Sequence, residues 1–138
     1  MHLRRLGLVS IAVLLAQLLL GMAVNLWVTI GPHSPWSHIS HVALFAVHGI
    51  VGVALVLLTF LILAKAFEES SRRDKAAAAT AFVGVIGAAC CGVGFVSSGG
   101  ASGFSFGMAV GWVVILAADL FLVLPATGTS RVTRSPEG

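Results

Sequence analysis

Three histidines lie close together in the second quarter of the chain. His38 and His41 are three residues apart, and His48 follows seven residues later. Residues three apart share one face of a helix, so His38 and His41 could hold a metal ion together. Imidazole nitrogens suit zinc, copper and nickel, but no carboxylate or thiol lies nearby in the sequence. The alternative is that both are solvated side chains at the start of a helix.

His48 differs from the other histidines because it falls well inside an apolar run. At 1.5 Å per helical residue it lies about 10 Å deeper than His41. An ionisable side chain at that depth in a membrane is a functional-site candidate. Histidine commonly holds haem iron, and Gly49 or Gly52 would let a flat macrocycle approach the backbone. We therefore predict a cofactor site at His48 and Gly52.

Gln17 comes to a similar depth on the first apolar run. It could orient a ring nitrogen of His48, as neighbouring side chains do at metal sites. An opposing interpretation is that His48 only forms a hydrogen bond with Gln17 or a carbonyl and holds helices together. A proton or substrate relay is the third interpretation. Cys90, Cys91 and Trp112 reach the same depth, which predicts a polar layer around His48.

A haem iron would need a second axial ligand. His41 and His48 stand about 10 Å apart along one helix, so they cannot hold one iron from opposite faces. The last two apolar runs contain no histidine. The second ligand would come from Met22, Met108, a loop histidine or a second subunit.

The composition requires a membrane as the solvent of this chain. Of its 138 residues 58% are hydrophobic and 9% are charged, and its mean hydropathy is +1.04. Soluble domains carry about 25% charged residues. A chain this short could not bury so much apolar surface in its own core. No P-loop, GxGxxG, Ser-His-Asp or CxxC motif is present, so no enzyme class is indicated.

Four apolar runs organise the chain. Each has about 20 residues or more, enough to cross a hydrocarbon core of about 30 Å as a helix. They cover residues 6–27, 39–64, 76–96 and 104–124. Short connections make consecutive helices antiparallel neighbours. We predict an all-α, integral membrane, four-helix up-and-down bundle in a single domain, 1–124, followed by a disordered tail, 125–138.

The basic residues predict the orientation of this bundle. All eight Lys and Arg residues fall on one side of the four runs, before the first, around the second connection and after the fourth. By the positive-inside rule both termini and the tail are cytoplasmic, in a bacterial-type inner (plasma) membrane. The net charge of +3 is therefore explained by topology, and no nucleic-acid partner is expected.

Three further features lie inside the last two runs. Asp119 is the only acid within a run, and we expect it to pair with basic groups or, alternatively, to couple to protons. The adjacent Cys90 and Cys91 are expected to act as small packing residues. Small residues recur every four positions, and such a stripe predicts close helix packing within the chain or a homodimer seam. The stripe consists of Gly84, Ala88 and Gly92.

The segment from Gln17 to Asn25 (QLLLGMAVN), a histidine-containing loop and His48 carry a resemblance. Together they resemble small bacterial four-span membrane proteins and, more distantly, four-helix half-bundles of the heme A synthase type. The resemblance implies a b-type haem or redox-associated protein with His48 as axial ligand and Gln17 beside it. The alternatives are a non-enzymatic accessory or assembly subunit of a membrane complex, or a small oligomeric transporter. Beyond the lipid bilayer, the expected partners are copies of the chain or other subunits.

Overall fold

The predicted fold class, an all-α four-helix bundle, is confirmed. A computed structural model describes residues 2–31, 39–69 and 71–124. The helices are α1 (His2–Trp27), α2 (Val42–Glu69), α3 (Arg72–Ser97) and α4 (Ser102–Val123). The tail expected at 125–138 lies outside the described residues.

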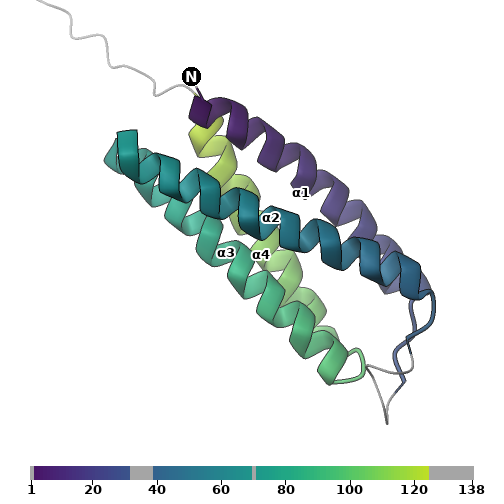
Figure 1. Cartoon of the computed structure of the whole chain (residues 1–138). Helices are drawn as coiled ribbons and strands as arrows, with labels where there is room; N and C mark the ends of the chain where they lie inside the picture. Colours follow the sequence, from purple (N-terminus) through teal and green to yellow (C-terminus); the bar gives the residue numbers. More distant parts are fainter. Residues whose placement is uncertain (1, 32–38, 70, 125–138) are drawn as a thin grey trace, which may run out of the picture.

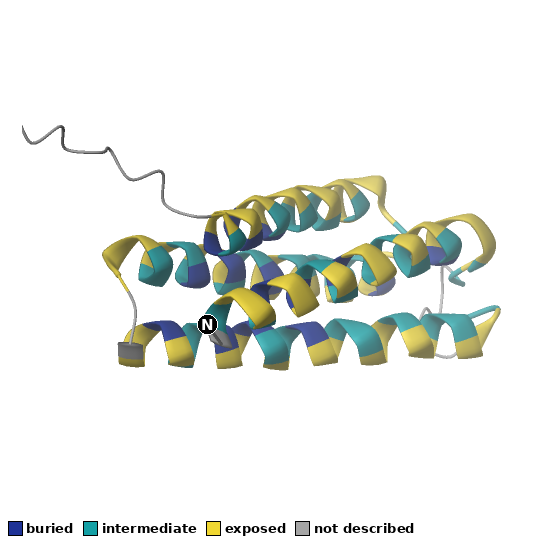
Figure 2. Ribbon diagram, turned by 90° about the horizontal axis from the view of Figure 1, so that it is seen from above, coloured by how far each residue is buried: buried dark blue, intermediate teal, exposed yellow. Residues whose placement is uncertain are grey.

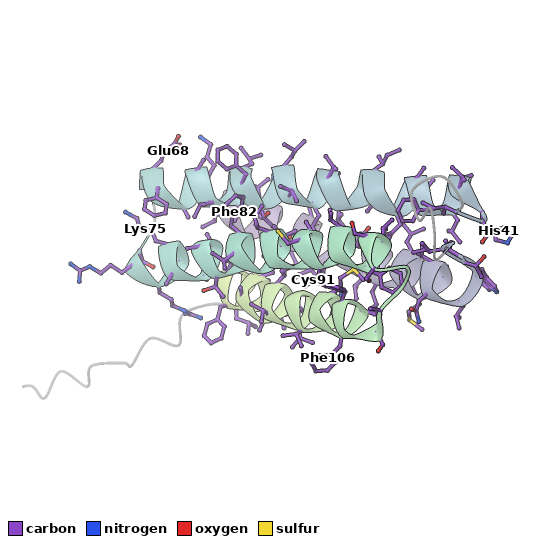
Figure 3. The ribbon with its side chains drawn as sticks, turned by 90° about the horizontal axis from the view of Figure 1, so that it is seen from below. His41, Glu68, Lys75, Phe82, Cys91 and Phe106 are labelled. Carbon is purple, nitrogen blue, oxygen red and sulfur yellow. The ribbon has the colours of Figure 1, made fainter. Side chains whose placement is uncertain are left out.

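The four helices run up and down side by side (Figure 1). In the described residues α1 packs against α2 and α4, and α3 packs against the same two helices, whereas the backbones of diagonally opposite helices do not approach each other closely. The beginnings of α1 and α3 and the ends of α2 and α4 share one end of the bundle, called here the basic end. Figure 3 shows Glu68 and Lys75 at this end and His41 at the other, called the His41 end.

All four helices are long and apolar enough to cross a membrane. Buried residues lie where helices meet, and exposed residues follow the outer faces (Figure 2). These outer faces are apolar: Leu19 and Ile50 are each 68% exposed, and Phe106 is 71% exposed. Such a surface would be an aggregation hazard in water and suits contact with lipid.

Three of the helices, α1, α2 and α3, extend beyond their apolar runs at the basic end. The apolar runs mark only the lipid-exposed length, whereas helical hydrogen bonding continues into polar residues. α3 begins with a capping box: the Ser71 hydroxyl accepts from the Asp74 amide N–H, and the Asp74 carboxylate accepts from the Ser71 amide N–H, both at 3.3 Å. α3 therefore starts at Arg72, four residues before its apolar run.

Two core clusters lie along the bundle axis. The central core cluster is made of Leu14, Leu55, Ala81, Val85, Ile115 and Ala118. The basic-end core cluster is made of Ile62, Ala66, Ala78 and Leu122, with Leu3 and Leu6 packed against it. Every helix contributes to this apolar interior. Buried polar residues must therefore lie between the two clusters or beyond them along the bundle axis.

The small-residue stripe of α3 faces α4. A Cβ atom on Gly111 would lie 2.9 Å from the Cβ of Ala88 and 3.1 Å from the carbonyl oxygen of Gly84. Gly92 lies opposite the sulfur of Met108, which would be 3.6 Å from an added Cβ. The predicted close packing within the chain is therefore confirmed, because only residues this small let the two backbones approach so closely.

Candidate functional site

A cavity of about 480 Å³ lies between the helices in the half of the bundle nearer the His41 end. Its size falls within the range of small-molecule sites, about 300–1,000 Å³. Most of its wall is aliphatic or aromatic, and all four helices contribute. The polar side chains in the wall are Gln17, Asn25, His48, Ser105 and the indole of Trp112. A largely apolar wall with a few polar groups is typical of a binding site.

Gln17 of α1 and His48 of α2 meet on this wall. The amide Nε2 of Gln17 lies 3.4 Å from the imidazole Nε2 of His48. Two glycines make room for them. A Cβ on Gly21 would lie 3.3 Å from Cε1 of His48, and a Cβ on Gly52 would lie 3.1 Å from Nε2 of Gln17. Each polar side chain therefore rests over a glycine of the opposite helix.

Two polar atoms of this pair have no hydrogen-bond partner. The amide Oε1 of Gln17 and the imidazole Nδ1 of His48 are both buried and unpartnered. A buried polar atom without a partner costs about 1–3 kcal/mol. Trp112 is different, because its indole N–H donates to the carbonyl oxygen of Leu14 at 2.9 Å. The unpartnered atoms are thus confined to the Gln17–His48 pair on this wall, within the described residues.

One ring nitrogen of His48 is occupied by its contact with Gln17. An axial bond needs a ring nitrogen that faces open space. Nε2 faces the Gln17 amide at 3.4 Å, whereas Nδ1 has no hydrogen-bond partner. Met22 and Met108 do line the same cavity. An iron at Nε2 would nevertheless have to displace the Gln17 amide.

The predicted metal residues are only partly described. His38 lies outside the described residues. His41 is exposed and directly precedes α2, with a φ of 49°, and its carbonyl oxygen accepts from the amides of Leu44 and Phe45. No group of three or more His, Cys, Asp or Glu side chains gathers anywhere in the described ranges. His41 therefore lies at a helix start and belongs to no such group of three in that part of the chain.

The two cysteines do not belong to the polar layer expected around His48. Cys90 is exposed, and Cys91 packs into the α3–α4 contact, where its sulfur would lie 2.7 Å from a Cβ on Gly107. Neither lines the cavity, whereas Gln17, His48 and Trp112 all do. Depth along a helix was predicted well by residue counting, but the side of the helix was not.

Asp119 makes no ion pair among the described residues. Its side chain is fully buried, and both carboxylate oxygens lack a hydrogen-bond partner. Arg73, a basic residue near the start of α3, donates to the carbonyl oxygen of Phe121 at 3.3 Å, and its guanidinium lies over the Phe121 ring. The described residues therefore do not contain the ion pair that was predicted for Asp119.

Gly21 is the site residue that the sequence analysis missed. The signal was present: Gln17 and Gly21 are four residues apart, as are His48 and Gly52. Residues four apart share one face of a helix. When the two helices pack antiparallel, the polar residue of each pair therefore lies opposite the glycine of the other pair.

No known protein family, curated protein or solved structure matches the chain. The fold and the cavity therefore define its class, a four-helix bundle whose helices are long and apolar enough to span a membrane, with a cavity between them.

Proposed function

We propose that this protein binds a small, mostly apolar molecule inside the membrane, in the cavity beside Gln17 and His48. The observation that supports this most is the pair of buried, unpartnered polar atoms on a mostly apolar cavity wall. A ligand that pairs with them removes the cost of leaving them unsatisfied. The function is one of binding, as in an accessory subunit of a membrane complex or a small transporter, without catalysis.

The chemistry of the wall describes the ligand. A primary amide offers donors and an acceptor, and an imidazole offers one donor or acceptor at each nitrogen. Whichever way the Gln17 amide is turned, one of its atoms faces His48 and the other is left over. We infer a ligand with a hydroxyl or carbonyl group at one end and a hydrocarbon body. The body would gain roughly 25 cal/mol for each Å² buried against the wall.

The finer topology is part of the same proposal. The described basic residues lie at the basic end, where α1 and α3 begin and α2 ends. By the positive-inside rule this end faces the cytoplasm of a bacterial-type cell. The cavity then lies in the outer half of the plasma membrane, where a lipid-soluble molecule could enter between helices.

The experiment compares the small molecules extracted by solvent from three purified proteins. The wild-type chain should retain a species that Gly49→Leu loses, because Gly49 lines the cavity and a Cβ there meets nothing within 4 Å. The added side chain has room at this exposed edge of the cavity and is expected to narrow it without a clash. Gly87→Leu is the matched control, since Gly87 also has open space around it but does not line this cavity. Equal recovery from all three proteins would contradict the proposal.

The same preparations test haem, the cofactor that the sequence suggested. A purified wild-type protein with a Soret band that His48→Ala abolishes would replace our proposal with a haem protein. A colourless protein that retains an extractable ligand supports the proposal. This outcome is expected because Nε2 of His48 already faces the Gln17 amide.

A further inference from the structure

A second polar feature lies deeper toward the basic end, outside the cavity. Ser10, Thr59 and Asp119 come from three different helices, and all three side chains have 0% exposure. Along its own helix, each of the three has a residue of the central core cluster on one side. On the other side it has a residue that belongs to the basic-end core cluster or packs against it. The flanking residues are Leu6 and Leu14 in α1, Leu55 and Ile62 in α2, and Ala118 and Leu122 in α4. The three side chains therefore form one polar layer between two apolar cores.

Hydrogen bonding within this layer is incomplete. The hydroxyl of Thr59 donates to the carbonyl oxygens of Leu55 and Val56, each at 3.0 Å. The hydroxyl of Ser10 and both carboxylate oxygens of Asp119 have no partner. Ser10 is the polar side chain next to Asp119. Two neighbouring groups are thus left unsatisfied in a place that water does not reach.

No positive charge faces Asp119 in the described part of the chain. α4 packs against α1 and α3, which present Ser10 and the alanines Ala78 and Ala81 at this level. Arg73 is exposed and is held at Phe121 instead. An ionised carboxylate without a partner is strongly unfavourable in an apolar interior, whereas a protonated carboxyl group needs only one acceptor.

The layer also has no room for a metal ion. All three polar side chains are fully buried, so no water-sized space adjoins them. Hard cations in proteins take six or more oxygen ligands, of which this layer offers few. We propose that Asp119 is an intramembrane proton-binding site, in which the protonated carboxyl group donates to the Ser10 hydroxyl. This site is separate from the proposed ligand cavity and does not depend on it.

The contact between α1 and α4 seals the site. A Cβ on Gly7 would lie 3.1 Å from Cγ2 of Val123 and 3.8 Å from the carbonyl oxygen of Asp119, so the two helices approach closely beside the layer. Loss of the proton would leave a bare charge there and would require water to enter. Protonation of Asp119 is therefore coupled to closure of the bundle between α1 and α4.

Infrared spectroscopy of the purified full chain tests the proposal. The C=O stretch of a protonated carboxyl group is distinct from that of a carboxylate, and the chain has only five acidic residues. At neutral pH the wild-type protein should show a protonated carboxyl band that Asp119→Asn removes. Glu68→Gln is the control, because Glu68 is exposed and pairs with Lys65 at 2.7 Å. Absence of the band from the wild-type protein would overturn the proposal, and this result needs no variant.

Thermal unfolding in detergent at several pH values gives a second test. An exposed aspartate in the unfolded chain has released its proton above about pH 4. The folded bundle keeps that proton, so raising the pH favours the unfolded chain and lowers the melting temperature. We expect this decrease in the wild-type protein and in Glu68→Gln, and not in Asp119→Asn, which cannot ionise. The same pH dependence in Asp119→Asn as in the wild-type protein would contradict the proposal.

Discussion

Gln17 and His48 each have a glycine four residues further along the chain, and each glycine lies beneath the polar side chain of the opposite helix. Because α1 and α2 are antiparallel, the two pairs interlock (Figure 1). The arrangement lets two polar side chains enter a helix contact without separating the backbones. It also places Nε2 of the imidazole against the Gln17 amide, so an iron bound at Nε2 would have to displace that amide.

The space above Gly21 gives the first prediction. Gly21→Leu should lower the free energy of unfolding by about 1–3 kcal/mol, because the new side chain must displace the His48 imidazole. Thermal unfolding in detergent measures the change. Gly87→Leu is the control, since an added Cβ there meets nothing within 4 Å. Equal stability of the two variants would show that His48 does not rest on Gly21.

At the scale of the helices, the apolar runs predicted how many helices the chain forms, their order and the direction in which each runs. A fixed rise per residue also placed Gln17, His48 and Trp112 at one depth. Rotation about the helix axis could not be predicted, because these helices are apolar nearly all round and have no single apolar face. For this reason Cys90 was assigned to the polar layer but is exposed, and Gly52 was assigned to His48 but lies under Gln17.

The contact between α3 and α4 gives a prediction at this scale. Gly111→Ala should destabilise the bundle by about 1–3 kcal/mol, because the new Cβ would lie 2.9 Å from Ala88 and 3.1 Å from the Gly84 backbone. The backbones would have to move apart. Gly87→Ala, on the open side of α3, should be neutral or stabilising by up to about 1 kcal/mol, because alanine is the better helix former. Chemical or thermal unfolding of both variants distinguishes these effects, and a Gly111→Ala variant as stable as Gly87→Ala would refute the close contact.

The whole molecule is organised in levels along the bundle axis. From the basic end, the basic-end core cluster is followed by the polar layer with Asp119, the central core cluster and the cavity with Gln17 and His48. The two polar levels are separated by apolar packing. Changes at Asp119 and at His48 are therefore expected to act independently.

The orientation of these levels in the membrane can be measured directly. In a background without the native cysteines, Ser98→Cys should react with a membrane-impermeant thiol reagent in intact cells, because Ser98 lies at the His41 end. Ser71→Cys, at the basic end, should react only after the cells are permeabilised. This follows from the positive-inside rule. The reverse labelling pattern would show that the cavity lies on the cytoplasmic side.

Native mass spectrometry of the intact protein, released from detergent, tests most directly whether the cavity holds a ligand through Gln17 and His48. The account predicts one bound small molecule per wild-type chain. Occupancy should fall in Gln17→Leu and His48→Leu, which remove the polar contacts, and should be lost in Gly49→Leu. Gly87→Leu should keep wild-type occupancy. A wild-type chain that carries no small molecule, or one whose adduct is unchanged in Gln17→Leu, His48→Leu and Gly49→Leu, would contradict the account.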